Sequence, residues 1–370
     1  MDAGSTSNIK VPSIFIVAHD DRHRGELNAA LSPYFEVSVF DSSGAAVDAL
    51  GNTDPDVIIA ENDIPPAGGI NQLVARASDE HHKAGFLLTR HKGEEFSISL
   101  DNTGRPGRYL TWPFAASLLM SSINELINEK AEMAWEDLPD TQRKTLKMTV
   151  EEYQGIADKI ASGEPLQYNT AADSCAPLVT AINEGGHHAL LKNVQSHHNY
   201  TYVHSMRVAT LLTMFGYGIG MRGDDLLILS TGGLLHDVGK MVTPPQILDK
   251  PGKLTEEEWP IMRDHVVESG NLLDGGDDMA KGAKIIAEQH HEKIDGAGYP
   301  KGLAGAELNE LARMSGIVDI FGALTDERSY KPPFPPAKAF EILESMKTGI
   351  DQNLLILFKD IFGGDAESGL

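Results

Sequence analysis

The chain has 370 residues, which is enough for two domains that each bury a core. Its hydrophobic fraction of 41% and charged fraction of 23% are those of a globular protein and exclude a disordered one. A formal net charge of −23 argues against a binder of nucleic-acid polymers or anionic membranes, and no apolar run is long enough for membrane insertion. A single cysteine, Cys175, and an N-terminus unlike a signal peptide favour a cytoplasmic location.

Strand-like and helix-like segments alternate over the first third of the chain. Short runs rich in β-branched and aromatic residues predict strands, and the segments between them predict helices. The predicted strands are 13–17, 35–40, 55–60 and 84–89, and the predicted helices are 18–31, 43–51, 69–77 and 115–135. This alternation predicts a doubly wound, parallel α/β domain.

The pattern changes at Leu138, after which long amphipathic helical segments dominate. The second domain is therefore predicted to be an all-α bundle. We expect a multi-domain chain made of a disordered tail over 1–11, the α/β domain over 12–126, a helical linker over 127–174 and the bundle over 175–370.

The stretch "PDVIIAENDIPPAGG" gives the α/β domain a recognisable register. It resembles the receiver domain of two-component response regulators, in which an aspartate after the third strand accepts a phosphoryl group. The resemblance places Glu61 at the phosphoacceptor position, with Pro65 and Gly69 at the expected offsets, and Thr89 after the fourth strand. A glutamate there gives no ordinary aspartyl-phosphate site.

Other parts of the receiver chemistry are missing as well. Ala18 and His19 stand where receivers carry the acidic pair that holds Mg²⁺, and Trp112 stands where receivers carry a lysine. We expect a degenerate receiver kept for dimerisation or docking; the alternatives are a domain held permanently on by the charge of Glu61, or a shifted register that uses Asp20 or Asp63. The histidines of this half are expected on the surface without a metal role: His19, His23, His81, His82 and His91.

Histidines and aspartates recur on successive predicted helices of the second domain. They are His204, His236, Asp237, His265, His290, His291 and Asp319. Such residues can converge in the core of a bundle, and each carboxylate oxygen of Asp237 could hold a different ion. This mixture of imidazole and carboxylate suits iron or manganese, with zinc possible and magnesium less suitable. Adjacent residues on a helix point about 100° apart, so His290 and His291 can serve one centre only if their helix ends there.

Several segments in order resemble the HD-GYP domain, a branch of the HD phosphohydrolase superfamily. They are "HDVGK" (236–240), "HHEKIDGAGYP" (290–300), "LARMSGIVDIFGALT" (311–325) and "ERSYK" (327–331). The family hydrolyses cyclic di-GMP to pGpG and sometimes on to GMP, in bacterial second-messenger signalling. The resemblance therefore implies a metal-dependent phosphodiesterase with cyclic di-GMP as its ligand.

The resemblance also implies roles for individual residues. His204, His236, Asp237 and Asp319 would surround one ion, and Asp237 would bridge to a second ion held by His265, His290 and His291. Tyr200 stands where three-metal members carry glutamate, so two ions are expected. Asp237 and Lys240 would be the catalytic residues. The substrate would contact Lys240, Gly298, Tyr299, Pro300, Arg328 and Lys331, whereas the matching Arg313 has no assigned role.

Two other functions stay open. Because Ile294 stands where the family usually has tryptophan, the chain could be a catalytically weak cyclic di-GMP sensor or interaction protein. It could also be an HD hydrolase of another nucleotide, although the Gly-Tyr-Pro sequence argues against this. A homodimer and a partnership with GGDEF-type or other signalling proteins are further expectations.

Overall fold

The computed structural model describes residues 11–78, 83–101, 103–248, 250, 252–276, 278–326 and 333–363. The chain divides into two compact units, Met1–Glu136 and Asp137–Leu370, which are described separately below. No helix in these described ranges has both the length and the apolar character needed to cross a membrane.

The N-terminal unit is built on one parallel sheet. Its elements are β1 (Ser13–Val17), α1 (Asp21–Leu31), β2 (Glu36–Phe40), α2 (Ser43–Leu50), β3 (Val57–Glu61), α3 (Gly69–Ala77), β4 (Gly85–His91), β5 (Gly107–Trp112) and α4 (Ala116–Ala134), followed by a short 3-10 turn, η1 (Trp135–Asp137). The strand order is β2-β1-β3-β4-β5 and every pairing is parallel. This is the doubly wound order of receiver-type folds, so the predicted fold is confirmed.

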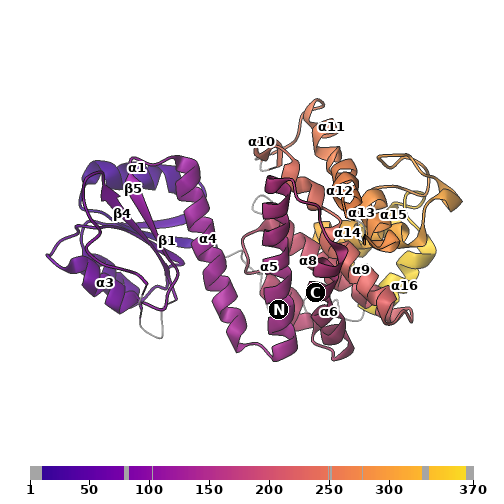
Figure 1. Ribbon diagram of the computed structural model, residues 1–370, viewed down its shortest axis with the longest axis horizontal. Helices are drawn as coiled ribbons and strands as arrows, with labels where there is room; N and C mark the ends of the chain where they lie inside the picture. The colour runs from indigo at the N-terminus through magenta and orange to yellow at the C-terminus, as the bar shows by residue number, and fades with distance from the viewer. Residues whose placement is uncertain are drawn as a thin grey trace, which may run out of the picture. The chain divides into compact units, whose positions relative to one another are not determined.

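Helices lie on both faces of this sheet (Figure 1), and an apolar layer fills the space on each face. Successive residues of a strand point to opposite faces. Ile14 and Ile16 accordingly pack with residues of α1 and α4, whereas Phe15 and Val17 pack with residues of α2 and α3. Covering on both faces explains why β1 and β3 are almost wholly apolar. Because both faces of the sheet are covered, the polar residues of this unit gather at the carboxyl ends of the strands.

The C-terminal unit contains helices and 3-10 turns in its described parts. They are α5 (Asp140–Ser162), α6 (Tyr168–Asn183), α7 (His187–Val194), α8 (Tyr200–Gly218), α9 (Asp224–Leu235), η2 (Val238–Val242), α10 (Pro245–Leu248), α11 (Glu258–Arg263), α12 (His265–Asp274), α13 (Lys281–Gln289), η3 (Gly305–Glu307), α14 (Glu310–Thr325), α15 (Pro336–Ser345) and α16 (Gln352–Phe362). This confirms the predicted all-α fold.

Helix α8 occupies the middle of the bundle. It packs against α9, α14, α6 and α5, and most of its residues are buried. Helix α5, which the sequence analysis assigns to a linker, packs within this unit: Thr149 Oγ1 lies 3.0 Å from the hydroxyl of Tyr202 on α8. The exact domain limits remain a prediction.

Candidate metal centre

The seven proposed metal ligands come together in the bundle, at the ends or inner faces of five helices. His204 lies in α8 and Asp319 in α14, whereas His265 begins α12. His236 and Asp237 follow α9, and His290 and His291 follow α13, which ends at Gln289. All of them except the half-buried His291 are buried. The helix end before His290 is the one that the sequence predicted.

Glycines allow the helices that carry these residues to approach closely. A Cβ on Gly233 of α9 would lie 2.6 Å from the Cα of Ala209, so only glycine lets α8 and α9 touch backbone to backbone here. A Cβ on Gly239 would fall on the carbonyl oxygen of His265. These contacts bring His204 and His265 to the segment that holds Asp237.

The two oxygens of Asp237 face two different groups of histidines. Oδ2 lies 3.3 Å from His236 Nε2 and 3.9 Å from His204 Nε2. Oδ1 lies 3.2 Å from His265 Nε2 and 3.8 Å from His290 Nε2. One carboxylate therefore stands between two sets of donors.

The remaining proposed ligands extend these two sets. Asp319 Oδ1 lies 2.9 Å from His204 Nε2 and 3.8 Å from His236 Nε2. His291 joins His265 and His290, and the donor atoms of these three rings lie within 4.8 Å of one another. The donor atoms of His204, His236 and Asp319 meet the same limit.

Backbone carbonyls fix the orientation of three of the histidines. Nδ1 of His236, His265 and His290 lies 2.8, 2.6 and 3.0 Å from the carbonyl oxygens of Gly233, Met262 and Ala287, respectively. Because a carbonyl can only accept, each Nδ1 must carry the hydrogen, which leaves the lone pair on Nε2.

The Nε2 atoms of these three rings, and Oδ1 of Asp237, are buried and make no hydrogen bond. Buried polar atoms without partners are costly in free energy. Imidazole and carboxylate donors in this state fit divalent metal ions, and the carbonyl contacts are the outer interactions typical of metal-bound histidine.

The two carboxylates of the centre stay ionised in spite of their burial. Burial alone would raise the pKa of Asp237, but the electrostatic interactions of its carboxylate with the imidazole of His236 and the ammonium group of Lys240 hold that pKa well below its usual 3.8. Burial likewise acts to raise the pKa of Asp319, and the hydrogen bond from His204 reverses the shift. The centre thus keeps two negative charges ready for cations.

The pKa values of His204 and His291 shift in opposite directions. Burial lowers the pKa of His204, but its hydrogen bonds to Asp319 and Asp326 raise it to about 9. Burial lowers the pKa of His291 to about 4. At neutral pH the His204 ring of the metal-free protein is therefore protonated on both nitrogens, with Nε2 facing Asp319 and Nδ1 facing Asp326.

Asp326 is a site residue that sequence reasoning missed. Its Oδ2 lies 2.7 Å from His204 Nδ1, and its Oδ1 pairs with the guanidinium of Arg207. Arg207 also donates to Thr325 Oγ1 at 3.3 Å. Asp326 and Arg207 are both buried. The only sequence signal for Asp326 was its place directly before "ERSYK".

Two of the residues predicted to contact the substrate, Lys240 and Tyr299, lie against proposed metal ligands. Lys240 Nζ pairs with Asp237 Oδ2, and the lysine side chain is 21% exposed. The Tyr299 ring stacks on His291, with centroids 4.8 Å apart. The guanidinium of Arg263, which the sequence analysis did not single out, lies 5.1 Å from the centroid of the Tyr299 ring. Arg328 and Lys331 lie outside the described residues.

The Gly-Tyr-Pro segment is held in place by Glu292. This buried carboxylate accepts hydrogen bonds from the backbone N–H groups of Lys301, Gly302 and Leu303, at 2.6, 3.1 and 3.0 Å. Gly298 packs so closely on the backbone of residues 292–293 that a Cβ would overlap it, whereas Pro300 is exposed. Gly298 therefore shapes the loop, and its contact with substrate remains a prediction.

Arg313 binds the backbone of the segment that follows this loop. It donates to the carbonyl oxygens of Leu308 and Gly305 at 3.0 and 2.7 Å, and its Nη1 lies 3.3 Å from Asp351 Oδ2. These bonds tie this segment to α14, so Arg313, whose role the sequence left open, has a structural role.

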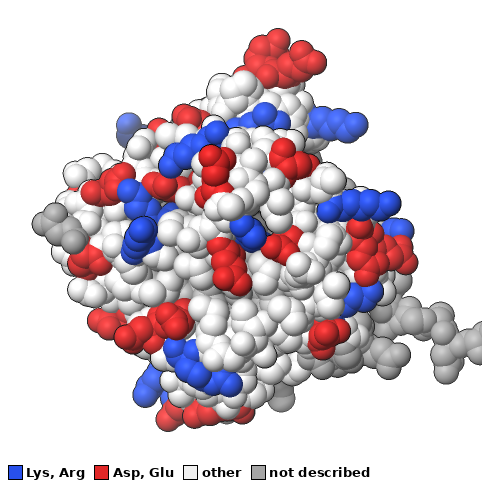
Figure 2. Space-filling view, turned by 90° about the vertical axis from the view of Figure 1, so that its right-hand side faces the viewer, with Lys and Arg blue, Asp and Glu red and all other residues white. Residues whose placement is uncertain are grey.

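Figure 2 shows one face of the C-terminal unit, on which acidic and basic side chains are interspersed. Positive charge is not gathered into one broad patch on the described part of this face. A phosphate-bearing ligand would therefore depend on local cations such as Lys240 and Arg263.

The N-terminal unit has a second polar site at the carboxyl ends of its strands. Glu61 ends β3, and Trp112 ends β5, as the receiver resemblance placed them. Asp20 accepts from the backbone N–H groups of Arg22 and His23 as the N-cap of α1. His23 is buried, with 4% of its surface exposed, so the expected surface position is wrong for this residue. His81 and His82 lie outside the described residues, and His19 and His91 are exposed.

Comparisons with known proteins point to the same part of the chain. Residues 189–354 match the family described as HD domain. A cyclic di-GMP phosphodiesterase of Pseudomonas aeruginosa is 34% identical over 175 residues, which are 47% of this chain and 42% of that protein. A 3'3'-cGAMP-specific phosphodiesterase of Vibrio cholerae is 36% identical over 189 residues, which are 51% of this chain and 41% of that protein.

Another similar protein covers both units. A probable cyclic di-GMP phosphodiesterase of Vibrio cholerae is 26% identical over 349 residues, which are 92% of this chain and 75% of that protein. By contrast, the chain spans only about two fifths of the length of the two relatives above.

Proposed function

We propose, from the match of residues 189–354 to the HD domain family, that this chain is a metal-dependent phosphodiesterase which hydrolyses cyclic di-GMP to pGpG and in part to GMP. The observation that carries the proposal is the position of Asp237 between two groups of donors. The names of two of the relatives support cyclic di-GMP as substrate. Bacterial second-messenger signalling is the corresponding setting.

The proposed centre holds two ions, with iron or manganese as the metals. An HD domain implies divalent metal binding, and the donors here are five imidazoles and two carboxylates. The proposed first ion lies among His204, His236, Asp237 and Asp319. The proposed second ion lies among Asp237, His265, His290 and His291.

Tyr200 supports the count of two. Its ring lies over that of His204 at a centroid distance of 6.1 Å and an interplanar angle of 11°. An aromatic side chain at this position offers no carboxylate to a third ion.

When bound, two such ions would lower the pKa of a water held between them and offset charge on the phosphoryl oxygens. The chain's own residues prepare the site for this. Asp237 keeps its negative charge, and the carbonyl contacts of His236, His265 and His290 aim Nε2 inward. Burial of the ligands excludes bulk water, which strengthens the electrostatic interactions inside.

Lys240 is proposed to hold a phosphoryl oxygen of the substrate. Its ammonium group already neighbours Asp237, and its side chain is the partly exposed member of the pair. A fixed cation at this point stabilises negative charge that grows in the transition state. Arg263, beside Tyr299, is proposed as a second cation for the substrate.

A cytoplasmic location, a homodimer and GGDEF-type or other signalling partners complete the proposal. The single cysteine, Cys175, is buried and unpaired, which supports a reducing compartment.

The proposal is tested by assaying the protein after it has been loaded with a defined metal ion. The protein is purified without oxygen, loaded with Fe²⁺ or Mn²⁺, and incubated with cyclic di-GMP, and the products are separated by chromatography. We expect pGpG to appear with either metal and to disappear after chelation. Tight binding of cyclic di-GMP by metal-loaded protein without any product would instead identify a sensor and contradict the enzymatic proposal.

A second candidate substrate is 3'3'-cGAMP, because one of the relatives is named as specific for it. Both nucleotides share the phosphodiester ring and differ in one base. Measuring kcat/KM for each on the same preparation decides between them. Our proposal requires a higher value for cyclic di-GMP; a higher value for 3'3'-cGAMP would transfer the assignment.

A further inference from the structure

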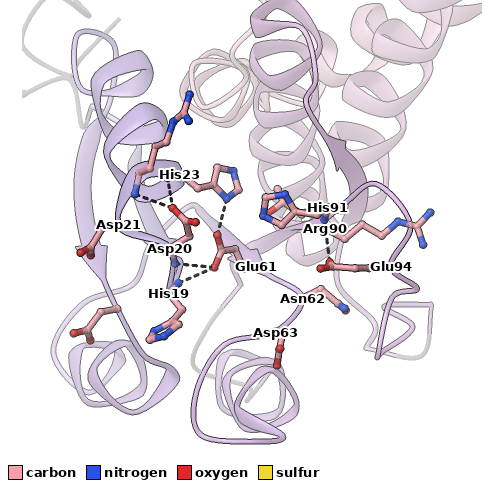
Figure 3. Close-up of a pocket in the computed structure, with 13 residues that line it drawn as sticks. His19, Asp20, Asp21, His23, Glu61, Asn62, Asp63, Arg90, His91 and Glu94 are labelled. Atoms are coloured by element: carbon pink, nitrogen blue, oxygen red, sulfur yellow. Dashed lines mark hydrogen bonds and ion pairs between the residues drawn. The ribbon is translucent and has the colours of Figure 1, made fainter.

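The polar pocket of the N-terminal unit has donors that the receiver chemistry does not explain. The pocket has a volume of about 720 Å³ and lies at the carboxyl ends of β1, β3 and β4. Figure 3 shows His23, Glu61 and His91 directed toward one another within it. None of the described residues at the usual acidic-pair or lysine positions supplies the ordinary receiver groups, since these are Ala18, His19 and Trp112.

Glu61 is held with one oxygen directed at His23. Its Oε2 accepts the backbone N–H of His19 at 2.7 Å and that of Asp20 at 3.4 Å. Its Oε1 lies 2.6 Å from His23 Nδ1. Burial acts to raise the pKa of Glu61, but the hydrogen bonds from His23 and these backbone groups lower it, so the carboxylate is charged.

His91 completes a group of three donors. It ends β4, and its ring centroid lies 5.9 Å from that of His23. One donor atom from each of His23, Glu61 and His91 lies within 4.8 Å of the others. The three residues come from α1, β3 and β4, so the fold rather than local sequence assembles them.

His23 is placed as a ligand would be. Its side chain is 3% exposed and packs against the ring of Trp112 at a centroid distance of 4.4 Å. Its Nδ1, which lies 2.6 Å from Glu61 Oε1, is the nitrogen that would bind the ion.

The charge around these donors favours a cation. Besides Glu61, the pocket lining carries more carboxylates than cationic side chains: Asp20, Asp21, Asp41, Asp63 and Glu94 against Arg22 and Arg90. The two imidazoles favour a transition metal over Mg²⁺, which prefers oxygen ligands and retains its waters.

We propose that His23, Glu61 and His91 bind one divalent transition-metal ion, with Zn²⁺ as the best fit. Zinc accepts nitrogen and carboxylate ligands at about 2.0–2.1 Å in a tetrahedral arrangement. Two ligands at that distance are roughly 3.3 Å apart, so His23 and Glu61 need only a small separation to admit the ion. The fourth position is open to the pocket.

The ion would tie the start of α1 to the ends of β3 and β4. Phosphorylation acts on the same edge of a receiver, and a metal that binds only the folded unit stabilises it by mass action. The N-terminal unit would then respond to zinc instead of a phosphoryl group. This inference does not depend on the proposed phosphodiesterase activity.

The experiment counts zinc in the full chain. Wild-type protein, His91→Ala, His23→Gln and His19→Ala are dialysed to equilibrium against the same buffered Zn²⁺ with excess Mg²⁺, and bound zinc is measured per chain. The metal centre of the C-terminal unit contributes equally to all four. We expect one ion fewer in His91→Ala and His23→Gln than in wild type, and no loss in His19→Ala, which alters another histidine of the same pocket.

A second measurement detects the bound ion beside Trp112, and it uses a variant at an exposed position, where misfolding is not expected. Because Trp112 packs on His23, bound Co²⁺ should quench tryptophan fluorescence more in wild type than in His91→Ala, whose altered side chain is exposed. Equal zinc counts in wild type and His91→Ala, equal quenching in the two, or loss of the ion from His19→Ala would each overturn the proposal.

Discussion

Asp326 Oδ2 lies 2.7 Å from His204 Nδ1, on the side of the ring that faces away from Asp319. Arg207 pairs with the other oxygen of Asp326 from α8, the same helix that carries His204. The ring of this proposed ligand is thus fixed by a buried carboxylate, whereas His236, His265 and His290 are fixed by carbonyls. A carboxylate at this position also makes the imidazole a stronger metal ligand.

Asp326→Asn should weaken metal binding without removing any ligand. The amide keeps the shape of the side chain but loses the charge that orients His204, and changes of this kind reduce metal affinity by roughly 10- to 100-fold. Titration with Mn²⁺ measures the effect. The control is Asp225→Asn, which removes an exposed aspartate of α9. Unchanged affinity in Asp326→Asn would show that Asp326 does not position His204.

Metal binding should release a proton from His204. Its pKa is raised to about 9, so the ring is protonated at neutral pH in the metal-free protein, whereas a metal ligand must be neutral. Apparent affinity should therefore rise with pH until about pH 9. Calorimetric titrations in buffers of different ionisation enthalpy give the number of protons released; zero protons at pH 7.5 would contradict this account.

The same pKa sets the pH dependence of metal-free stability. A folded-state pKa above the ordinary 6.5 stabilises the folded protein fully below pH 6.5, and this contribution is lost as pH rises through about 9. The lowered pKa of His291, about 4, has the opposite sign, and its effect lies below pH 6.5. The melting temperature of metal-free protein should thus fall between pH 6.5 and 9, and a rise in that window would be inconsistent with the charged His204.

Gly239→Ala should separate α12 from the segment that carries Asp237. The added Cβ would fall on the carbonyl oxygen of His265, so the backbone must shift, at a cost of about 1–3 kcal/mol in the free energy of unfolding. Metal affinity should fall with it, because His265 moves. Gly155→Ala in α5 is the matched control: it has open space around its Cβ and should raise stability by about 0.5–1 kcal/mol. Equal melting temperatures for the two variants would refute the close contact.

The N-terminal unit should not respond to phosphoryl donors. The Glu61 carboxylate is occupied by His23 and by backbone N–H groups, and Trp112 replaces the lysine that would pair with a phosphoryl group. Acetyl phosphate and beryllofluoride are expected to leave both the mass of the protein and its hydrolysis rate unchanged. A mass shift of one phosphoryl group on Asp20 or Asp63, together with an altered rate, would reverse this interpretation.

Some of these features follow from sequence patterns, and others depend on tertiary contacts. Strands β1 to β4 and the helix end before His290 could be predicted, because apolar runs and turn residues act locally. Strand β5 is not among the predicted strands, because most of its residues are only partly buried or exposed and form no such apolar run. The burial of His23 could also be predicted, because His23, Leu27 and Leu31 recur at four-residue spacing along α1 and so lie on one face of the helix.

Asp326 and Gly239 illustrate what the sequence does not contain. Asp326 contacts His204 across 122 positions of the chain, and no local pattern specifies such a pair. The need for glycine at position 239 arises from the approach of α12, which depends on the packing of the whole bundle.

The central claim is that Asp237 joins two metal ions, and the most direct test is the metal content and turnover of Asp237→Ala beside Lys240→Ala. Both substitutions are made in a His91→Ala background, which removes the ion proposed for the N-terminal unit. All samples are loaded with Mn²⁺, and bound metal and cyclic di-GMP hydrolysis are measured on each. We predict two ions per chain in the His91→Ala parent, loss of both ions and of all turnover on adding Asp237→Ala, and full metal content with a reduced rate on adding Lys240→Ala. Full metal content and activity with Asp237→Ala, or three well-occupied ions in the His91→Ala parent, would contradict the account.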